Sequence, residues 1–273
     1  MLDTTPQTTT LQRSHGRARV ALRAGGALDR MEQAGSAKVI LPRVHGPVPE
    51  AVFLNTSGGL TSGDRLEFQM DLAAGVRATA TTQTAERAYR ANGPAAQVRV
   101  VAHVGAGGRL DWLPQETILF EASALHRSTE INLAADAACL ICETVILGRH
   151  AMGETPQACA LTDRRVINRA NRPVLVETLR LDQTVLAAAH RPGILGGARA
   201  FAFVALVAEG AADALAPLRD VLTEPGVIAA ATAFDGKCIL RLTACDGWPL
   251  RRQIIRALAM LRPGHSLPRV WQA

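Results

Sequence analysis

The segment DRLEFQMDLAAG (residues 64–75) carries the clearest sign of the fold. Its apolar side chains Leu66, Phe68, Met70 and Leu72 alternate with polar ones. A two-residue period is typical of a strand with one face buried and the other in water. The segment therefore predicts a β-strand directly after a glycine-rich stretch.

Further strand-like runs recur at short intervals, separated by Gly, Pro, Asn or Asp. They occupy residues 51–55, 76–84, 96–104, 108–120, 128–134, 138–147, 164–168, 173–181 and 200–209. No long helical period appears before residue 210, so alternating βαβ units are not expected. The spacing predicts antiparallel meanders in a mainly β fold of stacked sheets.

The last quarter of the chain has a different pattern. Residues 212–226 place leucines on one helical face and stop at a Pro-Gly pair, and residues 246–264 repeat that arrangement. Between them, Asp235-Gly236 separates two strand-like runs, as in a hairpin with a tight type I′ turn. We expect a small α+β portion with two helices.

The expected organisation is a mobile polar leader over residues 1–14 and a single domain over 15–273. Within that domain, residues 15–208 form the β-rich body and residues 209–273 the α+β portion. The start of the chain lacks the pattern of a secretory signal, and no apolar run is long enough for a membrane span. A soluble, cytoplasmic protein without membrane contact is expected.

The charge comes almost entirely from arginine. The net charge is +6, and all but two of the 30 basic residues, Lys38 and Lys237, are arginine. Such a charge suits an acidic partner or nucleic acid, but the arginines are scattered rather than clustered. Solvated faces and ion pairs are therefore the favoured interpretation, and an RNA-binding β protein remains the alternative.

The glycine-rich stretch does not match a phosphate-binding loop. Gly58 and Gly63 have the Walker A spacing, but Asp64-Arg65 stands where Lys-Ser or Lys-Thr belongs. A carboxylate there would repel phosphate. A tight bend into the following strand explains the glycines, although it does not explain Asp64.

No catalytic motif is complete. The motifs G-x-S-x-G and H-E-x-x-H are absent. Cys139 and Cys142 would face opposite sides of a strand, so we expect two core thiols rather than a metal or redox pair. A carboxylate-dependent hydrolase stays open as an alternative, with acids on or near predicted strands at Asp64, Glu116, Glu121, Glu143 and Glu177.

Five segments together resemble the UreD (UreH) family of urease accessory proteins. They are the glycine-rich stretch, TTQTAERAYR (81–90), LDWLPQETILFEAS (110–123), LGRHAMGE (147–154) and the terminal LRPGHSLPRVWQA (261–273). They follow the family's order, and the resemblance runs from about residue 15 to the C-terminus. It implies a mostly β scaffold without catalytic activity that binds UreF and the GTPase UreG and docks on apo-urease.

The resemblance also implies a route for nickel. Family members are thought to guide nickel through an internal polar passage, with no tightly bound cofactor and only transient Ni²⁺. The associated acidic positions correspond to Asp64, Glu143 and Glu177. Structural alternatives stay open: Asp64 could cap its own turn, and Glu143 and Glu177 could pair with arginines on neighbouring strands. Cys142 precedes Glu143 where the family commonly has an aromatic residue.

Overall fold

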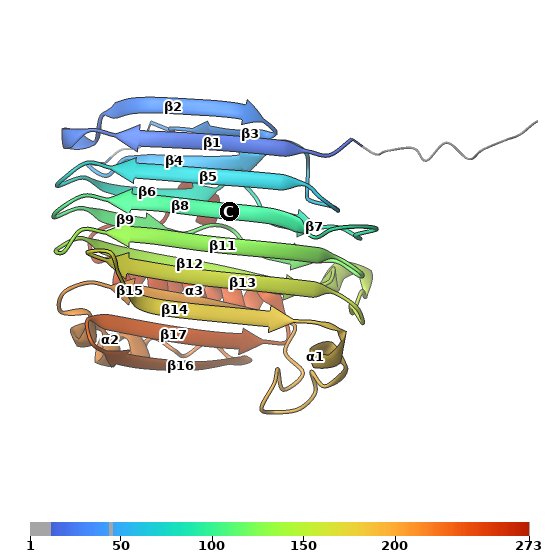
Figure 1. Cartoon of the computed structure of the whole chain (residues 1–273). Coiled ribbons are helices and arrows are strands. Elements are labelled where there is room, and N and C mark those ends of the chain that lie inside the picture. Colours follow the sequence, from blue (N-terminus) through green and yellow to red (C-terminus); the bar gives the residue numbers. More distant parts are fainter. Residues whose placement is uncertain (1–11, 44–45, 273) are drawn as a thin grey trace, which may run out of the picture.

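The structure consists of two β-sheets stacked face to face, with helices behind one of them (Figure 1). It is a computed structural model that describes residues 12–43 and 46–272. The front sheet has seven strands, in the spatial order β14 (Arg172–Leu181), β13 (Ala160–Arg169), β11 (Ala124–Leu133), β8 (Ala96–Val104), β5 (Arg65–Leu72), β1 (His15–Leu22) and β2 (Leu28–Gly35).

The back sheet has ten strands. Its main path is β16 (Val227–Phe234), β17 (Lys237–Ala244), β15 (Ala200–Val207), β12 (Ala138–Leu147), β9 (Arg109–Trp112), β6 (Arg77–Thr82), β4 (Glu50–Asn55) and β3 (Ala37–Ile40). Two short strands lie off this path: β10 (Thr117–Leu119) pairs with β12, and β7 (Glu86–Ala88) pairs with β10. The mainly β class is confirmed, and β5 buries the alternate side chains that its sequence pattern predicted.

The antiparallel expectation is wrong for the centre of both sheets. Strands β1, β5, β8, β11 and β13 pair in parallel, as do β4, β6, β9 and β12. The remaining pairs of the two main paths are antiparallel: β1 with β2 and β13 with β14 in the front sheet, and β3 with β4 and the run β12, β15, β17 and β16 in the back sheet. In the parallel centre, consecutive strands such as β5 and β6, or β8 and β9, lie in opposite sheets, so each pairs with a strand from the neighbouring coil of the chain.

Backbone hydrogen bonds between successive turns hold these coils in register. Three backbone N–H groups donate to a carbonyl of the preceding coil: Ala73 to Leu22, Gly105 to Leu72, and Ala134 to Val104. Each turn therefore stacks on the one before it, giving a solenoid-like body. Short-range alternation in the sequence does not distinguish this winding from a meander, because both use antiparallel consecutive strands.

The C-terminal elements follow the sequence pattern closely. The hairpin between β16 and β17 turns at Asp235 and Gly236, whose φ angles are 45° and 70°. Helix α3 (Gly247–Leu261) buries the predicted stripe and begins at Asp246, whose side chain accepts from the N–H of Trp248. The three α-helices of the described residues are α1 (Gln183–Ala187), α2 (Leu215–Asp220) and α3.

Helix α2 is shorter than expected, since it ends at Asp220 rather than near Pro225. The side chain of Gln253 on α3 donates to the carbonyl of Val221 and accepts from the N–H of Glu224. These bonds replace the ones that another helical turn would make. Short 3₁₀ turns occupy Ala24–Gly26, His150–Met152, Ala211–Ala214 and Arg269–Trp271.

Two apolar clusters form the core, one between the sheets and one between the back sheet and α3. Strand β12 contributes to both, which explains its continuous apolar run. Cys139 lies in the first cluster and Cys142 in the second, so the expected opposite orientation is confirmed. Burial raises the pKa of each thiol to about 12, which keeps both protonated at neutral pH.

The proposed division into a body and an α+β portion stays a prediction. The back sheet extends across the expected boundary at residue 208, because β15 on one side pairs along its whole length with β17 on the other. Residues 1–11 of the expected leader lie outside the described residues. No helix within residues 12–43 and 46–272 combines the length and the apolar composition that crossing a bilayer requires.

Candidate functional site

Four of the five segments quoted above meet at one end of the sheets, where β7 lies (Figure 1). The N–H of Leu60 donates to the carbonyl of Arg87, and the N–H of Phe120 donates to that of Ala88. The N–H of Glu121 in turn donates to a carboxylate oxygen of Glu154, which connects the third of these segments to the fourth. Segments far apart in the sequence therefore build one loop end of the molecule.

Asp64 is buried in the glycine-rich bend at this end. Its Oδ1 accepts from the N–H of Ser14 at 2.7 Å, and its Oδ2 accepts from the N–H of Thr61 at 2.8 Å. Gly58 and Gly63 have φ angles of 79° and 74°, which favour glycine. The tight bend is confirmed, and Asp64 closes it. A role for Asp64 in a nickel passage stays a prediction.

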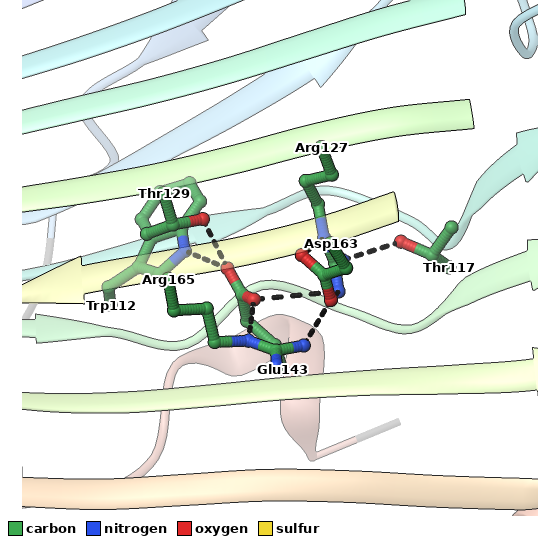
Figure 2. A network of polar contacts seen from close by, with 7 residues as sticks. All are labelled: Trp112, Thr117, Arg127, Thr129, Glu143, Asp163 and Arg165. Carbon is green, nitrogen blue, oxygen red and sulfur yellow. Dashed lines mark hydrogen bonds and ion pairs between the residues drawn. The ribbon is translucent and has the colours of Figure 1, made fainter. Parts of the chain in front are cut away.

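Glu143 lies deep between the sheets and is fully hydrogen-bonded (Figure 2). Its Oε1 accepts from Thr129 Oγ1 at 2.6 Å and from Trp112 Nε1 at 3.3 Å. Its Oε2 accepts from Arg165 Nε at 2.5 Å and lies 3.4 Å from Arg127 Nη2. The arginine alternative is therefore correct for Glu143, although both arginines belong to the opposite sheet.

A second acid, Asp163, completes this network (Figure 2). Arg127 donates to Asp163 Oδ1 at 2.9 Å and to Oδ2 at 2.5 Å, and Arg165 also donates to Oδ2. The remaining Nη1 of Arg127 donates to Thr117 Oγ1 at 2.9 Å. Two cations and two anions thus make a closed, formally neutral set, which we call the buried network.

The buried network keeps Glu143 ionised. Burial by itself would raise the pKa of Glu143, but Arg127, Arg165 and the hydrogen bond from Thr129 outweigh it and lower the pKa to about 2. A general acid in a glycosidase needs a raised pKa instead. Glu143 therefore does not suit the general-acid role that the hydrolase alternative requires.

Glu177 lies at the edge of the space between the two sheets, in which the buried network is found. Along the front sheet, Thr129, Arg165 and Glu177 stand directly opposite one another on β11, β13 and β14. Glu177 Oε2 accepts from Arg241 Nη2 on β17 of the back sheet at 2.7 Å. Glu177 is thus paired with an arginine, as the alternative expected, but that arginine lies in the opposite sheet rather than on a neighbouring strand, so the pair joins the two sheets at their edge.

Phe203 connects the edge pair to the buried network. Its ring lies between two guanidinium groups, with Arg165 Cζ at 5.2 Å and Arg241 Cζ at 5.4 Å from the centroid. In the back sheet, Glu143, Phe203 and Arg241 are direct cross-strand neighbours. Glu143 and Glu177 therefore belong to one line of side chains, whereas Asp64 lies at the loop end.

Glu86 is a candidate that the sequence analysis did not single out. It lines two small cavities of about 40 Å³ each, which also share Phe68 and Thr82. The outer cavity reaches Asn55 and Gly58 in the glycine-rich bend, and the inner one reaches the buried network. Glu86 therefore stands between the loop end and the interior.

The surroundings of Glu86 disfavour its charge. Burial, and to a smaller extent the charge of Asp64, raise the pKa of Glu86 to about 7. Hydrogen bonds from Asn55 Nδ2 and the N–H of Arg87, together with the charge of Arg87, lower the pKa but do not offset the burial. The signal in the sequence was the two-residue period, since Glu86 and the buried Ala88 share one face of β7.

Gln115 is a second residue that the sequence analysis missed. It lines the inner cavity, and its buried Nε2 has no hydrogen-bond partner among the described residues. Its Oε1 accepts from Arg251 Nη1 on α3 at 2.7 Å. The inner cavity is lined mainly by apolar side chains, so this unsatisfied buried donor marks the place in its wall where a water molecule could bind.

The described part of the chain contains no group of three or more His, Cys, Asp or Glu side chains arranged to hold a metal ion. The carboxylates of Asp64, Glu143 and Glu177 are instead bonded to separate sets of neighbours. Both oxygens of Asp64 and both of Glu143 accept hydrogen bonds, whereas only Oε2 of Glu177 accepts one from a described residue.

Comparison with known proteins identifies the family. A family model described as UreD urease accessory protein matches residues 14–272. A protein of Cereibacter sphaeroides named urease accessory protein UreD is 62% identical over 271 residues, covering 98% of both chains. Proteins of the same name from Paracoccus denitrificans and Dinoroseobacter shibae are 55% and 52% identical, each covering 96% of this chain and 93% of the relative. The chain therefore belongs to the UreD family of urease accessory proteins.

Proposed function

We propose that the chain is a non-catalytic scaffold for urease maturation in the cytoplasm. It assembles with UreF and the GTPase UreG on apo-urease and helps to deliver nickel to the urease active site. The observation that carries this proposal is the family match across residues 14–272, together with relatives whose names state the accessory role.

The interior of the sheets supports a route for the ion. The outer cavity lies against the glycine-rich bend and the inner one against the buried network, Glu86 lines both, and a line of side chains extends from the network to Glu177. Carboxylates, amides and water are oxygen donors that suit divalent ions, and they hold a transition metal less firmly than a cage of thiolates and imidazoles. A hydrated Ni²⁺ could therefore move on rather than remain bound.

The acids would contribute differently to this route. Asp64 would hold the bend at the entrance, and Glu86 would present a carboxylate whose charge varies near neutral pH. Both oxygens of Glu143 already accept hydrogen bonds, so it would attract the cation mainly through the field of the network. Glu177 is partly exposed and has one arginine partner, which makes it the easiest acid to free.

The test combines Asp64→Asn with Glu177→Gln and measures nickel in urease. Both replacements keep the side-chain shape and remove the charge. The variant, UreF, UreG and apo-urease are co-expressed, urease is purified, and nickel per urease is determined by elemental analysis. We expect lower nickel content, while the accessory proteins still elute as one species.

The matched control is Glu67→Gln with Glu130→Gln, two acids on the outer face of the front sheet. It removes the same charge without touching the interior, and we expect normal nickel content. Normal nickel in the Asp64 and Glu177 variant would rule out the route. Failure of the wild-type chain to co-elute with UreF and UreG would contradict the scaffold itself.

A further inference from the structure

The loop end carries arginines that the described chain does not neutralise. Arg65, Arg87 and Arg90 are exposed around the glycine-rich bend. None of them forms an ion pair with a described residue. Backbone bonds tie them to the bend, because Thr61 Oγ1 donates to the carbonyl of Arg90 and the N–H of Leu60 donates to that of Arg87.

The acids at this end are already engaged. Asp64 accepts two backbone N–H groups, and Glu121 accepts those of Gln157 and Ala158. Glu154 is paired with Arg149. The exposed charge of the loop end is therefore mainly positive, which attracts an acidic surface.

An aromatic residue stands among these arginines. Tyr89 is 38% exposed, and its ring packs edge-on against Phe120 with centroids 5.0 Å apart. Its hydroxyl donates to the carbonyl of Gly58 at 3.2 Å. A Cβ on Gly59 would lie 2.3 Å from the ring, so the bend needs glycine there to admit it. Tyr89 is thus held in place while remaining accessible.

We infer that the loop-end face, formed by Arg65, Arg87, Tyr89 and Arg90, docks an acidic segment of another protein that carries an aromatic side chain. Fixed tyrosine and arginine side chains are typical centres of protein interfaces. Nucleic-acid grooves often neutralise roughly six to ten phosphates, more than three arginines can match. This inference does not depend on a nickel route.

The test measures binding of a fluorescein-labelled, glutamate-rich peptide with one central phenylalanine to the full-length chain by fluorescence anisotropy. The variant is Arg87→Gln with Arg90→Gln. The matched control is Arg77→Gln with Arg172→Gln, which removes two exposed arginines at the opposite end of the sheets. We expect the first variant to bind about tenfold more weakly and the control to bind like the wild type.

Two peptide controls separate charge from aromatic contact. A peptide with glutamine in place of glutamate, and one with alanine in place of phenylalanine, should each bind more weakly than the parent. Equal losses in both arginine variants, or none in either, would overturn the inference. So would tighter binding of a mixed-sequence single-stranded RNA that is lost in the Arg87 and Arg90 variant. Thermal unfolding of both variants establishes that they are folded.

Discussion

The buried network around Glu143 and the edge pair of Glu177 with Arg241 use the same side-chain chemistry in different surroundings. In the network, the side chains of Glu143 and Asp163 are 1% and 0% exposed, whereas those of Glu177 and Arg241 are 26% and 54% exposed. Buried charges are tolerated only when each has its partners, while an exposed pair can open at little cost. The network therefore fixes the distance between the sheets, and the edge pair is free to rearrange.

The difference between Glu143 and Glu177 also affects what each acid could do in the proposed nickel route. A cation approaching Glu143 meets a set of charges that is already balanced, whereas one approaching Glu177 meets a carboxylate with a single arginine partner, bound to one of its two oxygens. Of the two acids, Glu177 is therefore the one that can lose its arginine partner without loss of the fold. Glu86 lies between these extremes, because it is partly buried and has no arginine within ion-pairing distance among the described residues.

The largest expected effect comes from unbalancing the network. Asp163→Asn would leave the buried Arg127 and Arg165 facing only one anion. We expect the free energy of unfolding to fall by about 3–5 kcal/mol, measured by urea denaturation. A loss no greater than that of an exposed pair would break the distinction between the two regions.

A smaller effect is expected from Glu86, and it depends on pH. Between pH 4.5 and about 7, the folded chain holds a proton on Glu86 that the unfolded chain releases, so stability falls as pH rises through this window. Glu86→Gln cannot ionise and should be more stable than the wild type above pH 7, by at most about 3 kcal/mol.

Urea unfolding of Glu86→Gln at several pH values tests this expectation, with the exposed Glu67→Gln as the control. Glu143 should behave oppositely: its lowered pKa contributes stability that is present above about pH 4.5 and is lost as pH falls towards 2. A wild-type difference across pH 4.5–7 that persists unchanged in Glu86→Gln would contradict the assignment to Glu86.

The smallest expected effect belongs to the edge pair. A double-mutant cycle of Glu177→Gln and Arg241→Gln should give a coupling energy below about 1 kcal/mol, decreasing as salt is added. The measurement is again urea unfolding. A coupling of several kcal/mol, insensitive to salt, would show that the edge pair is as rigid as the network and would weaken the role proposed for Glu177.

Much of the fold could be predicted because local patterns decide local structure. Alternation gave β5, Asp235-Gly236 gave the hairpin, and the leucine stripe gave α3. The pairing of strands could not be predicted in the same way, since a strand and its parallel partner are separated by a strand of the other sheet. Their contact depends on stacking of whole coils, which no short window of sequence contains.

For the site, the sequence already placed charged residues on inward faces. Arg127 shares a face with Leu125 and Ile131, and Arg165 shares one with Leu161 and Ile167. A charge in an otherwise apolar row predicts a buried partner.

By itself, then, the sequence determined which side chains point inward, where the chain turns, and the family to which it belongs. Only the tertiary structure decided that Arg127, Arg165, Asp163 and Glu143 meet, that Glu86 stands between two cavities, and that four motif segments share one end. The physical reason is that side-chain direction follows from backbone period over a few residues. Contact between charges instead requires two sheets to pack at one separation and register, which the whole core sets.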